Sequence, residues 1–154
     1  MARRSPAAIA LVEADHRLSY ASLWQRAGAF AGHLRERGLQ PGERVAVLLP
    51  NGSDAVVAIY GTWLAGGVVV SLNVQARRRD LVPWLRHCDA RVLVHQAAHA
   101  DAVAAAQDIG PSVQCLVAGS PTWPTGEPTH DPAMPAPGEH DPALILYTSG
   151  TTGA

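Results

Sequence analysis

The stretch ERVAVLLPNGSDAVVAIYGTWLAGGVVVSLN, residues 43–73, contains a complete strand–helix–strand unit. Its first apolar run, residues 45–49, is short, partly β-branched and followed by Pro50, as a buried strand would be. The Asn-Gly-Ser-Asp turn at residues 51–54 can cap a helix, whose apolar positions recur every three or four residues up to the glycine pair at 66–67. VVVSL then predicts a second buried strand. An uncharged helix between two buried strands is typical of a parallel sheet that is covered on both faces.

Elements of the same two kinds flank this unit. AIALVE and RLSY predict a short N-terminal hairpin, and Ser19 predicts the N-cap of a helix that ends at Gly38. After the unit, RRRDLVPWLRHC predicts a helix starting near Arg79 or Asp80, because Pro83 is tolerated best near a first turn. RVLVH, HADAVAAAQDI, VQCLVAG and ALILY then predict a strand, a helix and two further strands. This alternation predicts an α/β fold: a three-layer sandwich with a mostly parallel sheet flanked by helices.

The composition of the chain argues against several kinds of partner and location. The 154 residues suit one domain, and the formal net charge of −1 gives no electrostatic reason to expect nucleic acid or an anionic membrane as a partner. Cys88 and Cys115 lie far apart and are both expected to be buried, which fits a reducing, cytoplasmic location. Glu13 interrupts the N-terminal apolar stretch too early for a signal peptide. Residues 55–76 carry no charge over a length that can cross a bilayer, but the internal glycine pair and polar residues favour a helix followed by a strand, so no integral membrane segment is expected.

Three other patterns could carry chemistry. Residues 119–142 hold seven of the 12 prolines and two HDPA repeats, which favour a Pro-rich loop over a pair of metal-binding turns. His95 and His99 are spaced to share a metal, but no third ligand lies nearby, so no metal site is predicted. The run Arg77, Arg78 and Arg79 is expected to be a solvated segment before a helix rather than an anion site.

The tryptophans are expected to have structural roles. Trp24, Trp63 and Trp84 are expected to pack from helices, and Trp123 is expected to make a surface contact.

The sequence ends in LYTSGTTGA, residues 146–154, directly after the last predicted strand. A loop at the carboxyl end of a parallel strand is where open α/β sheets bind ligands. Glycines let several backbone amides approach an anion, and neighbouring hydroxyls add donors, so phosphate is the expected ligand. The spacing excludes a Walker loop, which needs G-x-x-x-x-G-K-[ST]. A flexible, functionless tail of small residues is the alternative.

YTSGTTG resembles the phosphate-binding signature of the adenylate-forming enzymes, which include acyl- and aryl-CoA synthetases, luciferases and the adenylation domains of peptide synthetases. Residues 17–73 and CDARVLV, residues 88–94, also resemble that family in order and spacing, although Ser71 stands where the family commonly has proline. The family pattern continues with one variable residue, here Ala154, and then Pro-Lys-Gly. The resemblance implies that the β- and γ-phosphates of ATP are held by the residues of the loop, Thr148, Ser149, Gly150, Thr151, Thr152 and Gly153.

The branch is indicated by VVVSLNVQ and by the Thr-Thr-Gly end of the loop, which resemble acyl-CoA synthetases more than peptide-synthetase adenylation domains. The complete enzyme is then expected to be an AMP-forming acid–thiol ligase, in a context such as fatty acid metabolism. It would join a carboxylic acid to AMP with loss of pyrophosphate, and pass the acyl group to coenzyme A. The implied cofactors are ATP, Mg2+ and coenzyme A.

Several family motifs are not in this sequence: those for adenine and ribose, the acidic residue that helps to place magnesium, and the catalytic lysine. The chain contains no lysine, and no catalytic residue is assigned to it. Residues 1–154 are therefore expected to be the N-terminal portion of an AMP-binding domain, inactive alone and prone to self-association through an open sheet edge. The alternative is a non-catalytic α/β module or gene remnant with a binding or interaction role.

Overall fold

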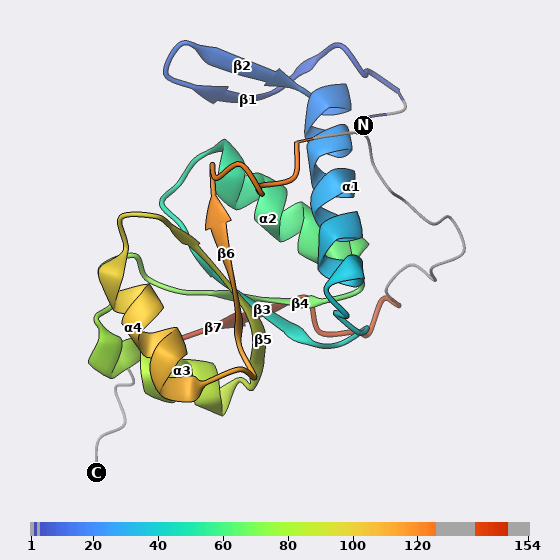
Figure 1. Cartoon of the computed structure of the whole chain (residues 1–154). Helices are drawn as coiled ribbons and strands as arrows, with labels where there is room; N and C mark the ends of the chain where they lie inside the picture. The colour runs from blue at the N-terminus through green and yellow to red at the C-terminus, as the bar shows by residue number, and fades with distance from the viewer. Residues whose placement is uncertain (1, 3, 126–137, 148–154) are drawn as a thin grey trace.

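The fold is built on a five-stranded sheet and a separate two-stranded hairpin (Figure 1). The computed structural model describes residues 2, 4–125 and 138–147. The sheet has the order β6-β5-β3-β4-β7, and each neighbouring pair of strands runs parallel. Its strands are β3 (Arg44–Leu48), β4 (Val68–Ser71), β5 (Ala90–Gln96), β6 (Gln114–Ala118) and β7 (Leu144–Leu146). The hairpin pairs β1 (Ile9–Glu13) with β2 (His16–Ser19) in antiparallel fashion.

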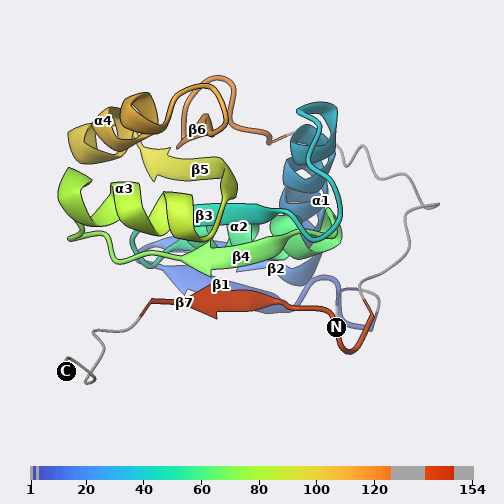
Figure 2. The same cartoon turned by 90° about the horizontal axis from the view of Figure 1, so that it is seen from below.

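Two helices cover each face of the sheet (Figure 2). Helices α1 (Tyr20–Glu36) and α2 (Ser53–Leu64) lie on one face, and α3 (Arg78–His87) and α4 (Ala100–Ile109) lie on the other. Val45 and Val47 of β3 pack with α1 and α2, whereas Ala46 and Leu48 pack with α3 and α4. Side chains of a strand point alternately to opposite faces, so a strand that is apolar throughout serves two cores. The predicted three-layer α/β sandwich is confirmed.

The residues predicted to mark the start and the end of α1 are confirmed in both positions. The Ser19 hydroxyl accepts a hydrogen bond from the Ser22 N–H at 3.2 Å, which satisfies one of the unpaired amides at the helix start. Gly38, at φ +85°, follows the last turn in a conformation that other residues rarely adopt.

Helix α3 departs from the prediction at its start. It begins at Arg78, so Pro83 is its sixth residue and not part of its first turn. Proline there removes the hydrogen bond to the Arg79 carbonyl, but Arg79 and Pro83 both lie on the exposed side, where water can take the missing donor's place.

Three side chains lie elsewhere than predicted. Trp24, expected to pack from its helix, is 48% exposed on α1. Trp123 is 5% exposed, not at the surface, and its ring centroid lies 5.0 Å from that of Phe30. A turn closed by the Trp123 N–H and the Ser120 carbonyl at 2.9 Å folds the ring back onto the core, although its neighbours have a typical loop composition. Cys115 is exposed on the edge strand β6, whereas Cys88 is buried as expected.

The uncharged run 55–76 forms most of α2, all of β4 and the loop after it. Among the described residues, no helix has both the length and the apolar character needed to cross a membrane. The described parts of the Pro-rich segment, residues 119–125 and 138–142, form no helix or strand. The remainder, including the first HDPA repeat, lies outside the described residues.

Candidate functional site

Strand β7 brings the chain to the carboxyl edge of the parallel sheet. It lies beside β4, with Val70 opposite Ile145 and Ser71 opposite Leu146, so the two strands end together. Their arrowheads point the same way in Figure 2. Ligands of open α/β sheets bind outside this edge, and Tyr147 is the first residue beyond it. The predicted site residues Thr148 to Gly153 follow Tyr147 directly in the sequence and lie outside the described residues.

The start of β7 is held by α2 and by its neighbouring strand. The indole Nε1–H of Trp63 donates a hydrogen bond to the Ala143 carbonyl at 2.8 Å. The same carbonyl accepts a second hydrogen bond from the Val69 N–H at 3.1 Å. Both lone pairs of this oxygen are therefore used, and the entry of the chain into β7 is fixed.

The end of β7 is held by α3 on the opposite face. The Tyr147 ring stacks on Trp84 with centroids 5.4 Å apart and planes 19° apart, and His87 meets its edge at 5.8 Å. The Tyr147 hydroxyl donates to the Trp84 carbonyl at 3.1 Å and lies 2.8 Å from Nδ1 of His87. A hydroxyl has one proton, so the imidazole must donate from Nδ1. We call this group, Trp84, His87 and Tyr147, the tyrosine clamp.

The hydroxyl of Tyr147 and the thiol of Cys88 are kept in their neutral forms. Burial raises the pKa of the Tyr147 hydroxyl, and the nearby Cys88 thiol adds to the effect. Burial also raises the pKa of Cys88, whose Sγ donates to the Leu85 carbonyl at 3.7 Å. A reactive cysteine needs a lowered pKa and access to solvent, so the structure gives Cys88 a packing role.

The arginine run beside this edge is exposed but forms ion pairs. Arg78 forms a two-pronged ion pair with Asp108 at 2.6 and 2.5 Å, and Arg77 lies 3.3 Å from Asp101. The Arg77 N–H donates to Asp80 and the Arg78 N–H to Asp101, each at 3.0 Å. Carboxylates thus face the positive end of α3, which offsets the arginines. All three arginines are exposed, as expected of a solvated segment, but Arg78 and Arg79 lie inside α3 rather than before it. The acidic partners of Arg77 and Arg78 come from α4, which the sequence did not indicate.

The two histidines weighed as a metal pair have separate structural roles. His95 is buried in β5, where Nδ1 lies 2.8 Å from the Gln96 carbonyl. His99 is the N-cap of α4: its Nδ1 accepts from the Ala102 N–H at 3.3 Å, and its Nε2 lies 3.1 Å from the Val74 carbonyl. In the part of the chain that the structure describes, no group of three or more His, Cys, Asp or Glu side chains is placed to hold a metal ion.

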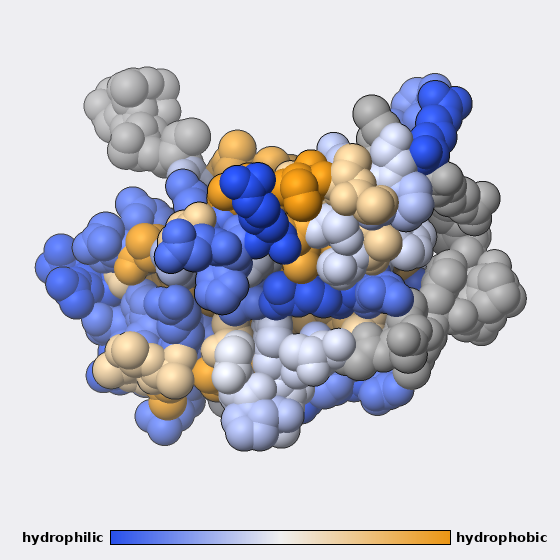
Figure 3. Space-filling view, turned by 90° about the horizontal axis from the view of Figure 1, so that it is seen from above, coloured by the Kyte–Doolittle hydropathy of each residue, from blue (hydrophilic) through white to orange (hydrophobic). Residues whose placement is uncertain are grey.

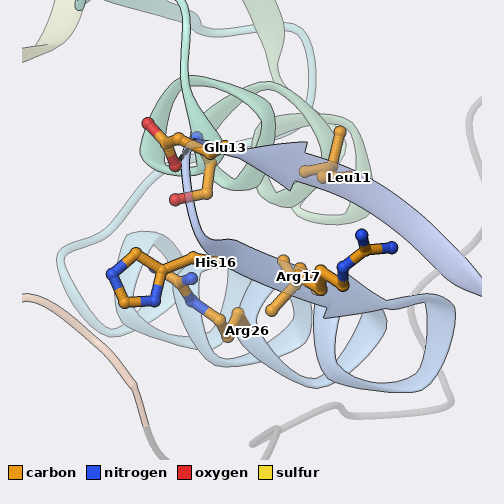
Figure 4. Close-up of a pocket in the computed structure, with 7 residues that line it drawn as sticks. Leu11, Glu13, His16, Arg17 and Arg26 are labelled. Carbon is orange, nitrogen blue, oxygen red and sulfur yellow. Dashed lines mark hydrogen bonds between the residues drawn. The ribbon is translucent and has the colours of Figure 1, made fainter.

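A hollow of about 240 Å³ lies between the hairpin and the helices α1 and α2 (Figure 4). Glu13 accepts a hydrogen bond from the Ser53 N–H at 3.0 Å, and hydrogen bonds from Ser53 lower the pKa of this carboxyl group. Arg26, also in the hollow, pairs with Asp54 at 2.7 Å. The charged groups here cap α2 and fix the hairpin to it, a role in folding rather than catalysis.

A wider, shallow hollow of about 900 Å³ lies against α1 and includes Trp24 and Tyr60. Hydrophobic side chains reach the surface on the face that carries the hairpin (Figure 3). This hollow is mainly apolar and its lining lacks a pair of acid and base groups, so the carboxyl edge near Tyr147 remains the best candidate site.

Sequence reasoning did not identify the residues that hold β7. Trp84 and His87 are three residues apart on α3 and therefore share a face, which is the one signal available beforehand. Nothing in the sequence pairs them with Tyr147, which is 60 residues beyond His87. Trp63 was expected to pack, but its hydrogen bond to Ala143 depends on the sheet order.

Known proteins that are similar to the chain in amino-acid sequence include a synthase and a synthetase. The chain is 36% identical to a feruloyl-CoA synthase of Amycolatopsis sp over 99% of its own length and 30% of that protein. It is 35% identical to the AMB antimetabolite synthetase AmbB of Pseudomonas aeruginosa, over 99% of the chain and 12% of that protein. The chain thus spans less than a third of the length of these relatives.

Solved structures of MatB from Rhodopseudomonas palustris share the fold. The apo form matches with a TM-score of 0.79 and 31% identity, over 96% of this chain and 30% of that one. The ATP-bound form matches with a TM-score of 0.73 and 33% identity, over 90% and 28% of the two chains. The family described as AMP-binding enzyme matches residues 1–154. The chain therefore belongs to the family of AMP-binding enzymes.

Proposed function

We propose that the chain is the N-terminal part of an AMP-forming acyl-CoA synthetase. The observation that carries the proposal is the parallel pairing of β7 with β4, which brings Tyr147, the residue directly before 148–153 in the sequence, to the carboxyl edge of the sheet. The identity to feruloyl-CoA synthase and the ATP bound to MatB support the same chemistry. The whole protein would act on a carboxylic acid, ATP and coenzyme A, substrates that fit a cytoplasmic enzyme.

In this proposal the amides and hydroxyls of residues 148–153 bind the β- and γ-phosphates of ATP. Hydrogen bonds to a charged oxygen each contribute about 1.5–3 kcal/mol, so several such donors hold a polyphosphate without a lysine. The substrate carboxylate then attacks the α-phosphorus, pyrophosphate leaves, and the thiol of coenzyme A takes the acyl group from AMP. Mg2+ is expected to accompany ATP, and no residue of this chain is assigned to it.

Hydroxylamine trapping tests the proposal. The complete gene product, incubated with ATP, Mg2+ and hydroxylamine, should convert one class of carboxylic acid to its hydroxamate and release AMP and pyrophosphate. The panel should include aromatic, fatty and sulfonated acids. Absence of product with every acid, from a protein shown to be folded, would contradict the ligase assignment.

A peptide-synthetase adenylation domain is the second candidate, and the 35% identity to AmbB favours it. The two candidates differ in the acid that is activated and in the thiol that receives it. Amino acids in the trapping panel, together with an assay for free acyl-CoA, separate them: acyl-CoA formation supports the synthetase, and amino acid hydroxamates without acyl-CoA support the adenylation domain.

Residues 1–154 by themselves are proposed to be inactive and to bind ATP weakly or not at all. The gene sequence after the codon for Ala154 should continue with the Pro-Lys-Gly of the family pattern. Calorimetry on the isolated chain provides the check, since micromolar affinity for ATP would contradict this view. A gene that stops after Ala154 would favour the non-catalytic module instead.

A further inference from the structure

We propose that the tyrosine clamp, Trp84, His87 and Tyr147, positions the phosphate-binding loop, so that affinity for ATP depends on a chain of hydrogen bonds that starts on α3. Tyr147 lies immediately before Thr148 in the sequence, and its side chain is held by α3. This inference rests on the proposed function of residues 148–153 as the triphosphate-binding loop.

The short strand β7 is followed at once by a side-chain anchor. The strand has three residues and pairs with β4 on one side, and the pair Ser71 and Leu146 is the last in its register. The pairing with β4 ends at Leu146, and the fixed ring of Tyr147 is the next restraint on the backbone.

The clamp restrains that ring in three ways. Stacking on Trp84 fixes the plane of the ring, and the hydrogen bond to the Trp84 carbonyl at 3.1 Å fixes its tip. The Nδ1–H of His87 donates a hydrogen bond to the same hydroxyl oxygen, with 2.8 Å between Nδ1 and the oxygen, and the two rings meet edge-on. With the hydroxyl proton directed to a carbonyl and the oxygen accepting from imidazole, the hydrogen bonds run from His87 through Tyr147 to Trp84.

The arrangement assigns Tyr147 a positioning role rather than a catalytic one. Its hydroxyl already donates one hydrogen bond to α3 and accepts another from it, and burial raises the pKa of this hydroxyl. A displacement of about 1 Å in a binding group can cost a large part of its effect, so loosening the ring should weaken the binding of the triphosphate.

The test uses the complete gene product and the KM for ATP in the hydroxylamine assay. Tyr147→Phe removes the hydroxyl but keeps the stacked ring, and His87→Ala removes the imidazole donor from an exposed position that folding tolerates. Each change should raise the KM for ATP about three- to tenfold, the usual effect of losing a neutral hydrogen bond, with a smaller change in kcat.

Two further variants separate positioning from general destabilisation. His87→Asn keeps an N–H close to the position of Nδ1 and should restore the KM for ATP to within about twofold of the wild type. Tyr60→Phe removes the hydroxyl of a half-exposed tyrosine on α2, which packs edge-on against Trp63, and should leave the KM unchanged.

The outcomes distinguish this inference from the proposal on which it rests. An active wild type whose KM for ATP is the same in Tyr147→Phe and His87→Ala would overturn the positioning role and leave the ligase function intact. Equal losses with His87→Ala and His87→Asn would also overturn it, because the N–H would then not matter. A folded wild type that activates no acid would overturn the proposed function and the positioning role together.

Discussion

The indole Nε1–H of Trp63 donates to the Ala143 carbonyl at 2.8 Å, although 80 residues separate the two in the sequence. This bond joins α2 on one face of the sheet to the start of β7, while the tyrosine clamp joins α3 on the other face to its end. A three-residue edge strand is weak by itself, and here both helical layers stabilise it. The position of Tyr147, directly before the candidate loop, thus depends on helices far from it in the sequence.

Loss of this contact should loosen β7. Trp63→Phe keeps an aromatic ring beside Tyr60 but removes the N–H, and should lower the free energy of unfolding by about 0.5–1.5 kcal/mol. Urea denaturation measures the change. Trp24→Phe, at a half-exposed position on α1, is the control and should cost less; an equal loss in both variants would mean that the hydrogen bond does not stabilise the fold.

Acid should weaken the contact between α3 and α4. Hydrogen bonds from Arg78 hold the pKa of Asp108 and that of Asp101 below the ordinary value of 3.8. A carboxyl group whose pKa is lowered by folding stabilises the folded state fully at pH values above its unfolded pKa. This stabilisation is lost as the pH falls through the pKa of the folded state. Stability of the wild type should therefore fall below about pH 4.

Asp108→Asn removes one of these carboxylates and should make the protein less stable at pH 7, with a shallower decline on acidification. Thermal unfolding between pH 7 and pH 2 is the measurement. Asp15→Asn, in the exposed turn of the hairpin, serves as the control. Superimposable acid profiles for the wild type and Asp108→Asn would show that the ion pair with Arg78 has no role in the pH dependence.

The contact of α1 with α2 should not tolerate a side chain at Gly61. An added Cβ would lie 2.7 Å from Cδ1 of Phe30 and 2.8 Å from the Ala27 carbonyl oxygen. Overpacking costs about 1–3 kcal/mol, whereas alanine gains about 1 kcal/mol over glycine inside a helix. Because a backbone atom is involved, we expect Gly61→Ala to unfold at lower urea concentration and Gly61→Ser to unfold lower still. A more stable alanine variant would contradict this packing.

The outer edge of β7 should promote self-association of residues 1–154. Leu144 and Leu146 are 46% and 62% exposed, and the described sheet has no strand beyond them. Leu146→Lys should reduce the association measured by light scattering. Val12→Lys, at an equally exposed position on the hairpin, should change it less. A wild-type chain that stays monomeric at high concentration would refute the expectation.

The sequence predicted the layers of the fold because its signals are local. Apolar runs such as residues 45–49 and glycines such as Gly38 report strands and helix ends directly, and the alternation of elements then implies a parallel sheet. Contacts between distant segments carry no such signal. Three such contacts could be identified only from the structure: those of Trp123 with Phe30, of Arg78 with Asp108 and of Tyr147 with Trp84.

The candidate site was predictable in part for the same reason. The strand that precedes the loop could be inferred from residues 143–147, whereas phosphate as the loop's ligand stays a prediction that rests on the resemblance of YTSGTTG to a known signature. The strand order places β7 at an edge, and that order depends on the packing of α2 and α3 against the whole sheet. The residues that hold β7 and Tyr147 therefore could not be named beforehand.

Residues 148–153 are proposed to bind the triphosphate of ATP. The KM for ATP of a variant in these residues tests this role most directly. In the complete gene product, Thr151→Ala combined with Thr152→Ala removes two hydroxyl donors at about 1.5–3 kcal/mol each. We predict a KM for ATP raised at least about tenfold, with the KM for the carboxylic acid little changed. An unchanged KM for ATP would contradict the account.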